Sequence, residues 1–239
     1  MDKILAVTRK ELRSYFNSPL AYIVIVLFLA VTGWFFTTTI FPTGLVTMRG
    51  ITENVIVHLV LLIFAAAISM RTFSEEKKSG TIELLLTKPL KDEDIVIGKF
   101  LSAWLLVIFT FIPTIIYAIS FKIFGLGSID LGTIISSYLG LILISSLYIS
   151  IGIFISSLTD NQVISFIISF LVILVLFLFN KILVFVPGPL VSTVEYLSSD
   201  FHFLNISKGV LDSKDLVYFF SGIFIMLLLT KTSLESRKW

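Results

Sequence analysis

The chain has 239 residues, of which 56% are hydrophobic and 14% are charged, and its formal net charge is +2. A mean hydropathy of +1.02 excludes a soluble globular fold, because about one quarter of the residues in soluble domains are charged. The small net charge argues against a nucleic-acid partner, and the absence of cysteine excludes disulfides and thiolate metal sites. We therefore expect an all-α membrane protein whose apolar side chains are solvated by lipid.

Residues 1–18 predict an amphipathic helix that lies in the membrane interface. The apolar arc of its helical wheel is expected to contact lipid, and the basic arc to contact head groups or a partner protein. A simple anchor and a partner surface both fit this pattern. Ser18 and Pro19 end the predicted helix. The apolar arc consists of Ile4, Leu5, Thr8, Leu12, Tyr15 and Phe16, and the opposite arc consists of Lys3, Arg9, Lys10, Arg13 and Asn17.

Six long apolar runs predict six transmembrane helices, because a bilayer core about 30 Å thick requires roughly 20 apolar residues per helix. Pro113 is expected to bend the third helix. In the fourth, small residues recur at a spacing of four, which favours close packing inside the chain over a dimer seam. The runs lie near residues 20–41, 54–70, 95–121, 131–156, 162–186 and 215–232, and the small residues are Ser136, Gly140, Ser146, Ser150, Gly152 and Ser156.

The distribution of Lys and Arg predicts the orientation in the cell membrane. Of the 18 Lys and Arg residues, 13 fall on the side that includes residues 1–18, 71–99 and 231–239. We therefore expect both termini, the connection between the second and third helices and the turn around Asp160 to lie in the cytoplasm. The opposite side holds Arg49, Lys122, Lys181, Lys208 and Lys214.

The cytoplasmic segment at residues 71–94 predicts a short helix that lies across the membrane face. Gly80 is placed to end one helix in the left-handed conformation, and Thr81 is placed to cap the next. Glu83 then lies near the positive end of the second helix, and Pro89 stops it.

This short helix carries more apolar surface than a solvated loop can hold, so it is expected to pack on lipid, on the bundle or on another protein. We interpret Glu76, Lys77 and Lys78, each considered by itself, as solvated charges that keep the connecting segment out of the bilayer. The apolar side chains are Ile82, Leu84, Leu85 and Leu86.

The segment at residues 187–214 predicts a helical hairpin at the outer interface, between the fifth and sixth spans. Apolar and charged residues alternate there, as expected of short helices that dip into the interface. His58 and His202 have no carboxylate or second histidine at ligand spacing, which argues against a metal site.

Several mechanisms find no support in the sequence. A Gly-x-x-x-x-Gly-Lys-Ser/Thr string is absent, since Gly98 and Lys99 lack the upstream glycine and the following hydroxyl residue. ATP would therefore have to be bound by another polypeptide. The spans carry almost no charge, with Lys181 and Asp160 at their ends, which argues against an ion-coupled carrier. Paired acids or an HExxH string in a span, which a hydrolase would need, are also absent.

The polar motifs of the chain carry a family resemblance. Glu75, Glu76, Gly80, Thr81, Glu83, Leu85, Leu86 and Pro89 resemble the first cytoplasmic loop of the ABC-2 type permeases, the membrane subunits of ATP-driven exporters. Asp94, Ile95, Val96, Gly98 and Lys99 resemble the start of that family's third helix, and Ser156, Ser157, Leu158, Thr159, Asp160 and Asn161 resemble its second cytoplasmic turn. The segment with His202, Phe203, Ser207, Gly209, Val210, Asp212, Asp215, Leu216, Tyr218 and Phe219, followed by Arg237, Lys238 and Trp239, resembles the branch of gliding-motility and nitrous-oxide-reductase-maturation permeases. The likeness covers nearly the whole chain, and we expect residues 1–239 to form a single domain of this kind.

The resemblance implies a permease subunit of an ATP-binding-cassette exporter. It implies that separate cytoplasmic P-loop ATPase subunits bind ATP and Mg, with no cofactor in this chain, and that a second copy or a homologous permease completes the transporter. Residues 81–87 would form a coupling helix, residues 1–18 would complete the same face, and the outer hairpin would shape the outer gate. A membrane anchor or scaffold of an envelope or motility complex, without transport, is the alternative. The implied ATPase-coupling residues are Glu75, Glu76, Gly80, Thr81, Ile82, Glu83, Leu84, Leu85, Leu86 and Pro89, and a second cytoplasmic contact comprises Thr159, Asp160, Asn161 and Gln162.

Overall fold

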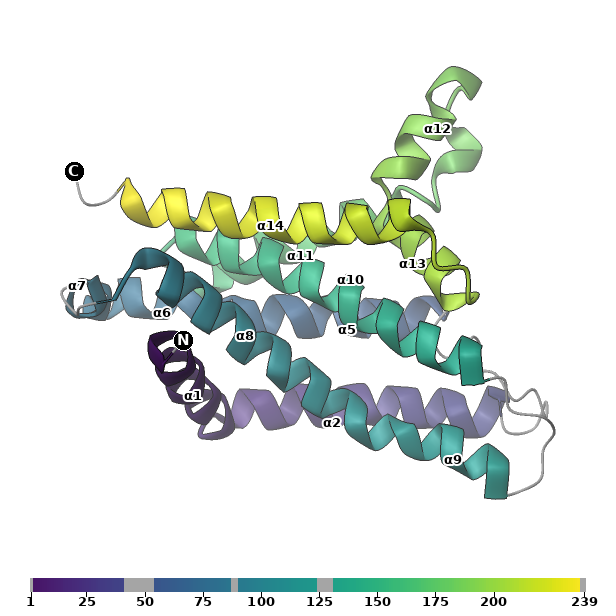
Figure 1. Ribbon diagram of the computed structural model, residues 1–239, viewed down its shortest axis with the longest axis horizontal. Coiled ribbons are helices and arrows are strands. Elements are labelled where there is room, and N and C mark those ends of the chain that lie inside the picture. The colour runs from purple at the N-terminus through teal and green to yellow at the C-terminus, as the bar shows by residue number, and fades with distance from the viewer. Residues whose placement is uncertain (1, 41–53, 87–89, 124–130, 237–239) are drawn as a thin grey trace.

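The computed structural model describes residues 2–40, 54–86, 90–123 and 131–236, and the regular elements within these ranges are all helices (Figure 1). Helices suit a lipid environment because they satisfy their backbone hydrogen bonds internally. In chain order they are α1 (Asp2–Phe16), α2 (Pro19–Phe35), α5 (Val55–Ser69), α6 (Arg71–Lys78), α7 (Thr81–Leu86), α8 (Asp92–Phe111), α9 (Ile115–Ile123), α10 (Leu131–Leu158), α11 (Gln162–Leu178), α12 (Gly188–Leu197), α13 (Ser199–Ser207) and α14 (Ser213–Glu235). Shorter π-helical or 3₁₀ segments are η1 (Phe36–Ile40), η2 (Ile112–Thr114) and η3 (Leu183–Phe185).

α10 forms the centre of the bundle and packs against α5, α6, α8, α11, α13 and α14. Its glycines let the neighbouring helices approach closely. A Cβ atom built on Gly152 would lie 1.9 Å from Ser69 Oγ of α5, and one built on Gly140 would lie 3.1 Å from the Phe203 ring of α13. The predicted packing of small residues inside the chain is therefore confirmed.

Among the described residues, five helical stretches are long and apolar enough to cross a membrane: Pro19–Thr38, Val55–Lys78, Asp92–Tyr117, Leu131–Leu158 and Ser213–Glu235. A further apolar helix, α11, has 17 residues. Each of the six predicted apolar runs thus contains a helix. Pro113, which was expected to bend the third run, lies in η2, where the α-helical pattern gives way to a 3₁₀ turn.

The fifth apolar run ends as a helix at Leu178, although the sequence predicts a span that continues to residue 186. Polar contacts explain this early end. Asn180 Nδ2 donates to Asp200 Oδ2 at 2.7 Å, and Lys181 Nζ lies 2.8 Å from the same oxygen. Because Asp200 belongs to α13, the hydropathy of the run does not reveal this stop. The predicted hairpin in residues 187–214 is formed by α12 and α13.

α1 packs against the bundle as well as lying along its surface. A Cβ atom built on Gly98 of α8 would lie 2.7 Å from the Val7 side chain, so only glycine allows this close approach. Thr8 Oγ1 donates to Gly98 O at 3.2 Å, and Tyr15 donates to a backbone oxygen of α5. The expectation that the whole apolar arc faces lipid is therefore wrong for Thr8 and Tyr15, although Leu5 is 60% exposed.

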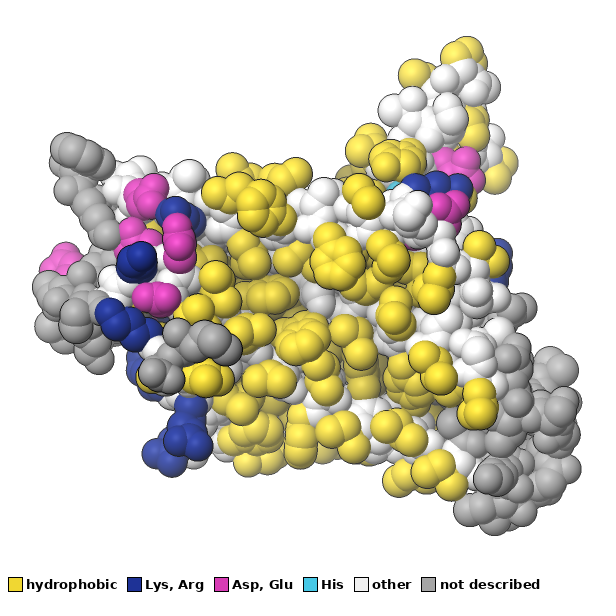
Figure 2. Space-filling model, in the orientation of Figure 1, with side chains coloured by type: hydrophobic (Ala, Val, Ile, Leu, Met, Phe, Trp, Pro, Cys, Tyr) yellow, Lys and Arg dark blue, Asp and Glu magenta, His cyan; other side chains and the backbone are white. Residues whose placement is uncertain are grey.

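The bundle has two different ends. One, which we call the α7 end, contains α1, α6, α7, the first turn of α8, the α10–α11 turn and the last turns of α14 (Figure 1). The other, which we call the α13 end, contains α13 and the first turns of α14, and α12 projects from the bundle there (Figure 1). Between them, one face of the molecule is mostly hydrophobic, with charged side chains gathered toward the two ends (Figure 2).

Candidate functional site

The α7 end brings together segments that the charge pattern assigns to the cytoplasm. Lys77 of α6 donates to Ser157 O near the end of α10, and Ser233 Oγ of α14 donates to the same oxygen at 3.3 Å. Lys231 of α14 forms an ion pair with Glu93 in the first turn of α8. The predicted ATPase-coupling segment and the predicted second contact therefore lie at the same end of the bundle.

Gly80 separates α6 from α7. Its φ of +70° is a left-handed conformation that glycine adopts without strain, and no heavy atom lies within 4 Å of a Cβ atom built on it. The predicted helix end is therefore confirmed. The predicted cap is wrong, because Thr81 is the first residue of α7 and does not precede it. Thr81 Oγ1 instead hydrogen-bonds to Ser79 Oγ at 2.8 Å and to Glu76 O at 3.4 Å.

α7 presents a charge outward and buries an apolar side chain. Glu83, in its first turn, is exposed, whereas Ile82 is 7% exposed. With six residues, α7 is too short to be stable alone, so it depends on its attachment to α6 and the bundle. The side chains of Leu84, Leu85 and Leu86, together with residue Pro89, lie outside the described part of the chain.

A cluster of charges around the buried Lys99 joins α6 to α1 and α8. The Lys99 side chain of α8 is 1% exposed, and its ammonium group donates to Thr72 O at 2.7 Å. Lys99 Nζ also lies 3.0 Å from Glu76 Oε2 of α6 and 3.4 Å from Glu11 Oε1 of α1. Lys10 Nζ lies 3.3 Å from Glu11 Oε1 and 3.6 Å from Glu76 Oε1. We call Lys10, Glu11, Thr72, Glu76 and Lys99 the Lys99 cluster.

The Lys99 cluster is stable because its two ammonium groups face two carboxylates. A buried ammonium without such partners would cost several kcal/mol of desolvation. Burial favours a lower pKa for Lys10, but the negative charges of Glu11 and Glu76 outweigh it and raise that pKa. The interpretation of Glu76 as a solvated connector charge is therefore wrong. The expectation that the spans carry almost no buried charge is wrong for Lys99.

Ser156 fixes the direction of α6 from the side of α10. Its hydroxyl accepts hydrogen bonds from Phe73 N at 3.0 Å and Ser74 N at 3.1 Å, and it donates to Met70 O at 2.9 Å. All three partners are backbone groups at the junction between α5 and α6, where a side chain from another helix has entered the hydrogen-bond ladder. Ser156, one of the small residues expected to favour helix packing, therefore also positions α6, the helix that leads to α7.

Lys77 caps the end of α10. Its ammonium group donates to Ser157 O, one of the last carbonyl groups of that helix, which lack an N–H partner from a following turn. A positive charge at this end of a helix is also favoured by the helix dipole. The interpretation of Lys77 as a solvated charge is therefore wrong, whereas Lys78 is exposed as expected.

Glu75, a predicted coupling residue, forms a bidentate pair with Arg71 of the same helix. Arg71 Nε and Nη2 donate to Glu75 Oε2 and Oε1 at 2.8 and 3.0 Å. Arg71 Nη1 donates to Ser18 Oγ, at the junction of α1 and α2. Bidentate pairs are the stronger and more directional kind of ion pair. Glu75 therefore helps to hold α6 against the N-terminal helices.

The second predicted contact is a tight turn between α10 and α11. Asn161 caps α11, because its Oδ1 accepts from Val163 N at 2.9 Å and from Ile164 N at 3.4 Å. Asn161 N donates to Thr159 Oγ1 at 3.2 Å, which closes the turn. Asp160 is exposed. The turn is thus held by its own side chains and leaves a carboxylate facing outward.

The α13 end contains a buried polar pair that is not apparent from the sequence. His202 Nδ1 lies 2.6 Å from Asp215 Oδ1, and His202 Nε2 lies 2.8 Å from Tyr196 O. Both ring nitrogens therefore face oxygen atoms of neighbouring residues, one from a side chain and one from the backbone. The Tyr218 ring stacks on the imidazole at 4.0 Å. Asp215 follows His202 by 13 residues, so the local spacing considered for a metal site does not reveal this partner.

Neither end is built like a metal centre. Among the described residues, no group of three or more His, Cys, Asp or Glu side chains could hold a metal ion. His58 packs against the rings of Phe177 and Phe203, with centroids 5.5 and 4.7 Å away. At the α7 end, α6 is instead joined to α1 and α8 through the Lys99 cluster, and to α10 through Ser156 and Lys77.

A comparison with family models identifies one that matches most of the chain. The model described as ABC-2 family transporter protein matches residues 5–210, a region that contains the Lys99 cluster, α7 and α13. A comparison with curated proteins found no match.

Proposed function

Because the chain belongs to the ABC-2 family of transporter proteins, we propose that it is the permease subunit of an ATP-binding-cassette exporter driven by ATPase subunits on separate chains. Members of this family are membrane components of transporters, and the apolar helices make this chain a multi-pass membrane protein. The proposal places the α7 end and both termini in the cytoplasm, in accordance with the distribution of Lys and Arg.

The observation that supports the proposal most strongly is the attachment of α7. This short helix carries the exposed Glu83, and the helix before it is held by the Lys99 cluster, by Ser156 and by Lys77. A solvated connector would have no need of ion pairs to α1 and α8 together with hydrogen bonds to α10. A helix that receives force from a partner would use such contacts, because packed side chains, hydrogen bonds and ion pairs carry coupling between distant sites.

In the proposed mechanism, ATPase subunits bind α7 and the α10–α11 turn. Closure of those subunits would displace α7, and the Lys99 cluster would carry the movement to α1 and α8. A second copy or a homologous permease would complete the pathway, because α10 already fills the centre of a single bundle.

Charge reversal at Glu83 tests the docking of α7. The permease should be co-expressed with its cognate ATPase, and co-purification, ATP hydrolysis and transport should be measured. Glu83→Lys is expected to weaken assembly or to uncouple hydrolysis from transport, although its direct cost to helix stability is only about 0.3–1 kcal/mol. Glu195→Lys, which makes the same change on α12, is the matched control and should behave as the wild type.

Two results would count against the proposal. Wild-type assembly and coupling by Glu83→Lys would mean that α7 is a passive connector. Normal assembly of the wild type with the ATPase, but without any translocation by the complex, would favour the alternative of a membrane scaffold.

The proposed orientation can be tested by labelling, because the chain contains no native cysteine. Lys78→Cys and Leu211→Cys place single thiols at exposed positions of opposite ends. In intact cells an impermeant thiol reagent should label the cysteine at position 211 and leave the cysteine at position 78 unlabelled until the cells are opened. Labelling of position 78 in intact cells would reverse the orientation.

A further inference from the structure

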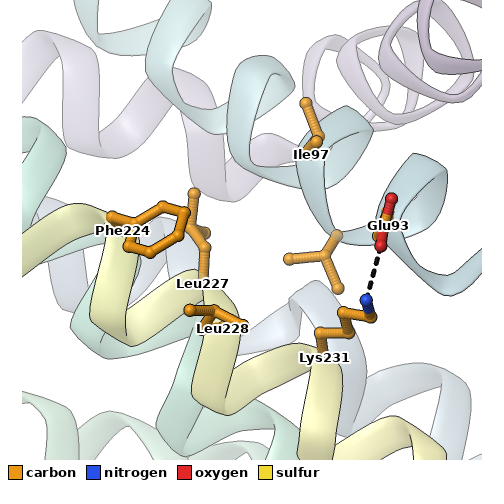
Figure 3. Close-up of a pocket in the computed structure, with 7 residues that line it drawn as sticks. Glu93, Ile97, Phe224, Leu227, Leu228 and Lys231 are labelled. Carbon is orange, nitrogen blue, oxygen red and sulfur yellow. Dashed lines mark hydrogen bonds and ion pairs between the residues drawn. The ribbon is translucent and has the colours of Figure 1, made fainter.

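A groove lies between α8 and α14 near the α7 end (Figure 3). It has a volume of about 350 Å³, and most of its lining is apolar. The Glu93–Lys231 ion pair closes one end of it (Figure 3). The apolar lining consists of Val96, Ile97, Phe224, Leu227 and Leu228.

A polar pocket of about 310 Å³ adjoins this groove, and Glu93 and Lys231 line both. The remaining side chains of the pocket are those of Lys91, Asp92 and Glu235. α8 begins at Asp92 and α14 ends at Glu235, so the pocket lies at the polar ends of two apolar helices that are long enough to cross a membrane. An apolar groove thus continues into a charged pocket at these helix ends.

We propose that the groove and the pocket together bind one bilayer phospholipid whose head group carries a primary ammonium beside its phosphate. The groove would hold part of an acyl chain, and the pocket would hold the head group. The pocket sets two lysines against three carboxylates, so it offers no excess positive charge to an anionic lipid. A zwitterion suits both signs, because its phosphate can accept from Lys91 and Lys231 while its ammonium donates to the carboxylates.

The head group must supply the selectivity at this site. An acyl chain meets an equally apolar environment in the surrounding bilayer and in the groove. The apolar lining alone therefore gives little preference for one lipid. The primary ammonium has N–H donors, whereas the quaternary ammonium of phosphatidylcholine has none. The site should therefore prefer phosphatidylethanolamine to both phosphatidylcholine and phosphatidylglycerol. This inference does not depend on the proposed transport function.

The test is a count of the lipids that remain bound to the purified full-length chain. Detergent-solubilised protein should be mixed with equal amounts of the three lipids carrying the same acyl chains and then examined by native mass spectrometry. We expect phosphatidylethanolamine to be retained about tenfold more than either other lipid, since charge-assisted hydrogen bonds contribute at this scale. Equal retention of all three lipids would overturn the proposal.

Substitutions locate the bound lipid. Leu228 lines the groove and Leu229 does not, yet the two side chains are 42% and 40% exposed. Leu228→Trp should fill the groove and abolish the preference, whereas Leu229→Trp should keep it. Glu93→Lys should shift the preference toward phosphatidylglycerol by adding positive charge. If Leu228→Trp changed the oligomeric mass and left the bound lipid unchanged, a second copy of the chain would occupy the groove and the proposal would be wrong.

Discussion

The two ends of the bundle bury charge in different ways. At the α7 end, the Lys99 cluster joins three helices through long side chains with several rotatable bonds. At the α13 end, His202 and Asp215 join α13 to α14 through one short contact, enclosed by the rings of Tyr196 and Tyr218. Lysine and glutamate side chains can follow a small helix shift without losing their ion pair, whereas an imidazole packed between rings cannot. The first arrangement suits transmission of movement, and the second suits a fixed hairpin.

The largest effect on stability is expected from Lys99→Met. Methionine fills much of the same space but removes the ammonium group, so Glu11 and Glu76 lose their buried partner and keep only the more exposed Lys10. Removing one partner of a buried ion pair costs about 3–5 kcal/mol. Unfolding of the detergent-solubilised protein by heat or denaturant should show this loss. Lys78→Met, at an exposed position of the neighbouring helix, is the control and should be nearly neutral.

A double substitution distinguishes the lost ion pair from a packing defect. Lys99→Met combined with Glu76→Gln removes one of the two carboxylates that lose the Lys99 ammonium group. The double variant should therefore recover part of the stability. If Lys99→Met were as stable as the wild type, the Lys99 cluster would not be the link between α6 and its neighbours, and the α7 end would not depend on its buried charge.

The next largest effect, about 3 kcal/mol, is expected from His202→Leu, which leaves the Asp215 carboxylate buried without its imidazole partner. Because the pair lies at the α13 end, assembly with the ATPase should persist in this variant. His202→Leu combined with Asp215→Leu should be more stable than the single variant. The measurements are unfolding in detergent and co-purification with the ATPase. Loss of assembly at unchanged stability would show that the two ends do not have the separate roles inferred here.

The sequence predicts features that depend on residues close together in the chain. The apolar runs, the left-handed Gly80 and the turn around Asp160 all follow from local patterns, and the structure contains them. The prediction for Thr81 is wrong by one position, because the sequence does not reveal whether Thr81 or Ile82 begins the helix.

Features built from distant residues are not predictable in the same way. Glu11, Glu76 and Lys99 come from three helices, so the charge pattern counts Lys99 as a topology signal, although the structure buries it. The sequence signal for the Lys99 cluster is the presence of Glu and Lys residues on three helices. Such residues are too common to identify a buried ion pair. The end of α11 depends equally on Asp200 of α13, which the apolar run does not contain.

The two ends also offer a matched pair of glycines. Gly80 at the α7 end and Gly209 at the α13 end have φ values of +70° and +85°. Valine at either position should cost about 1–3 kcal/mol, because a β-branched residue is strained at positive φ. Only Gly80→Val should also weaken assembly with the ATPase, since it redirects α7. Unfolding and co-purification of both variants would check this, and equal loss of assembly would mean that strain alone explains the effect.

The smallest effect is expected from Lys77→Ala. The substitution removes the ammonium group that donates to Ser157 O, but Ser233 Oγ still donates to that oxygen, so the carbonyl keeps a partner. The expected loss is about 1 kcal/mol, the usual net contribution of one hydrogen bond. Lys78→Ala removes the same kind of side chain one residue later, where it is exposed, and should change stability by less. Unfolding in detergent should resolve the two variants. If the two variants lost the same amount of stability, the effect at Lys77 would come from the loss of one positive charge at this end of the bundle. The contact between Lys77 and Ser157 O would then not hold α6 against α10.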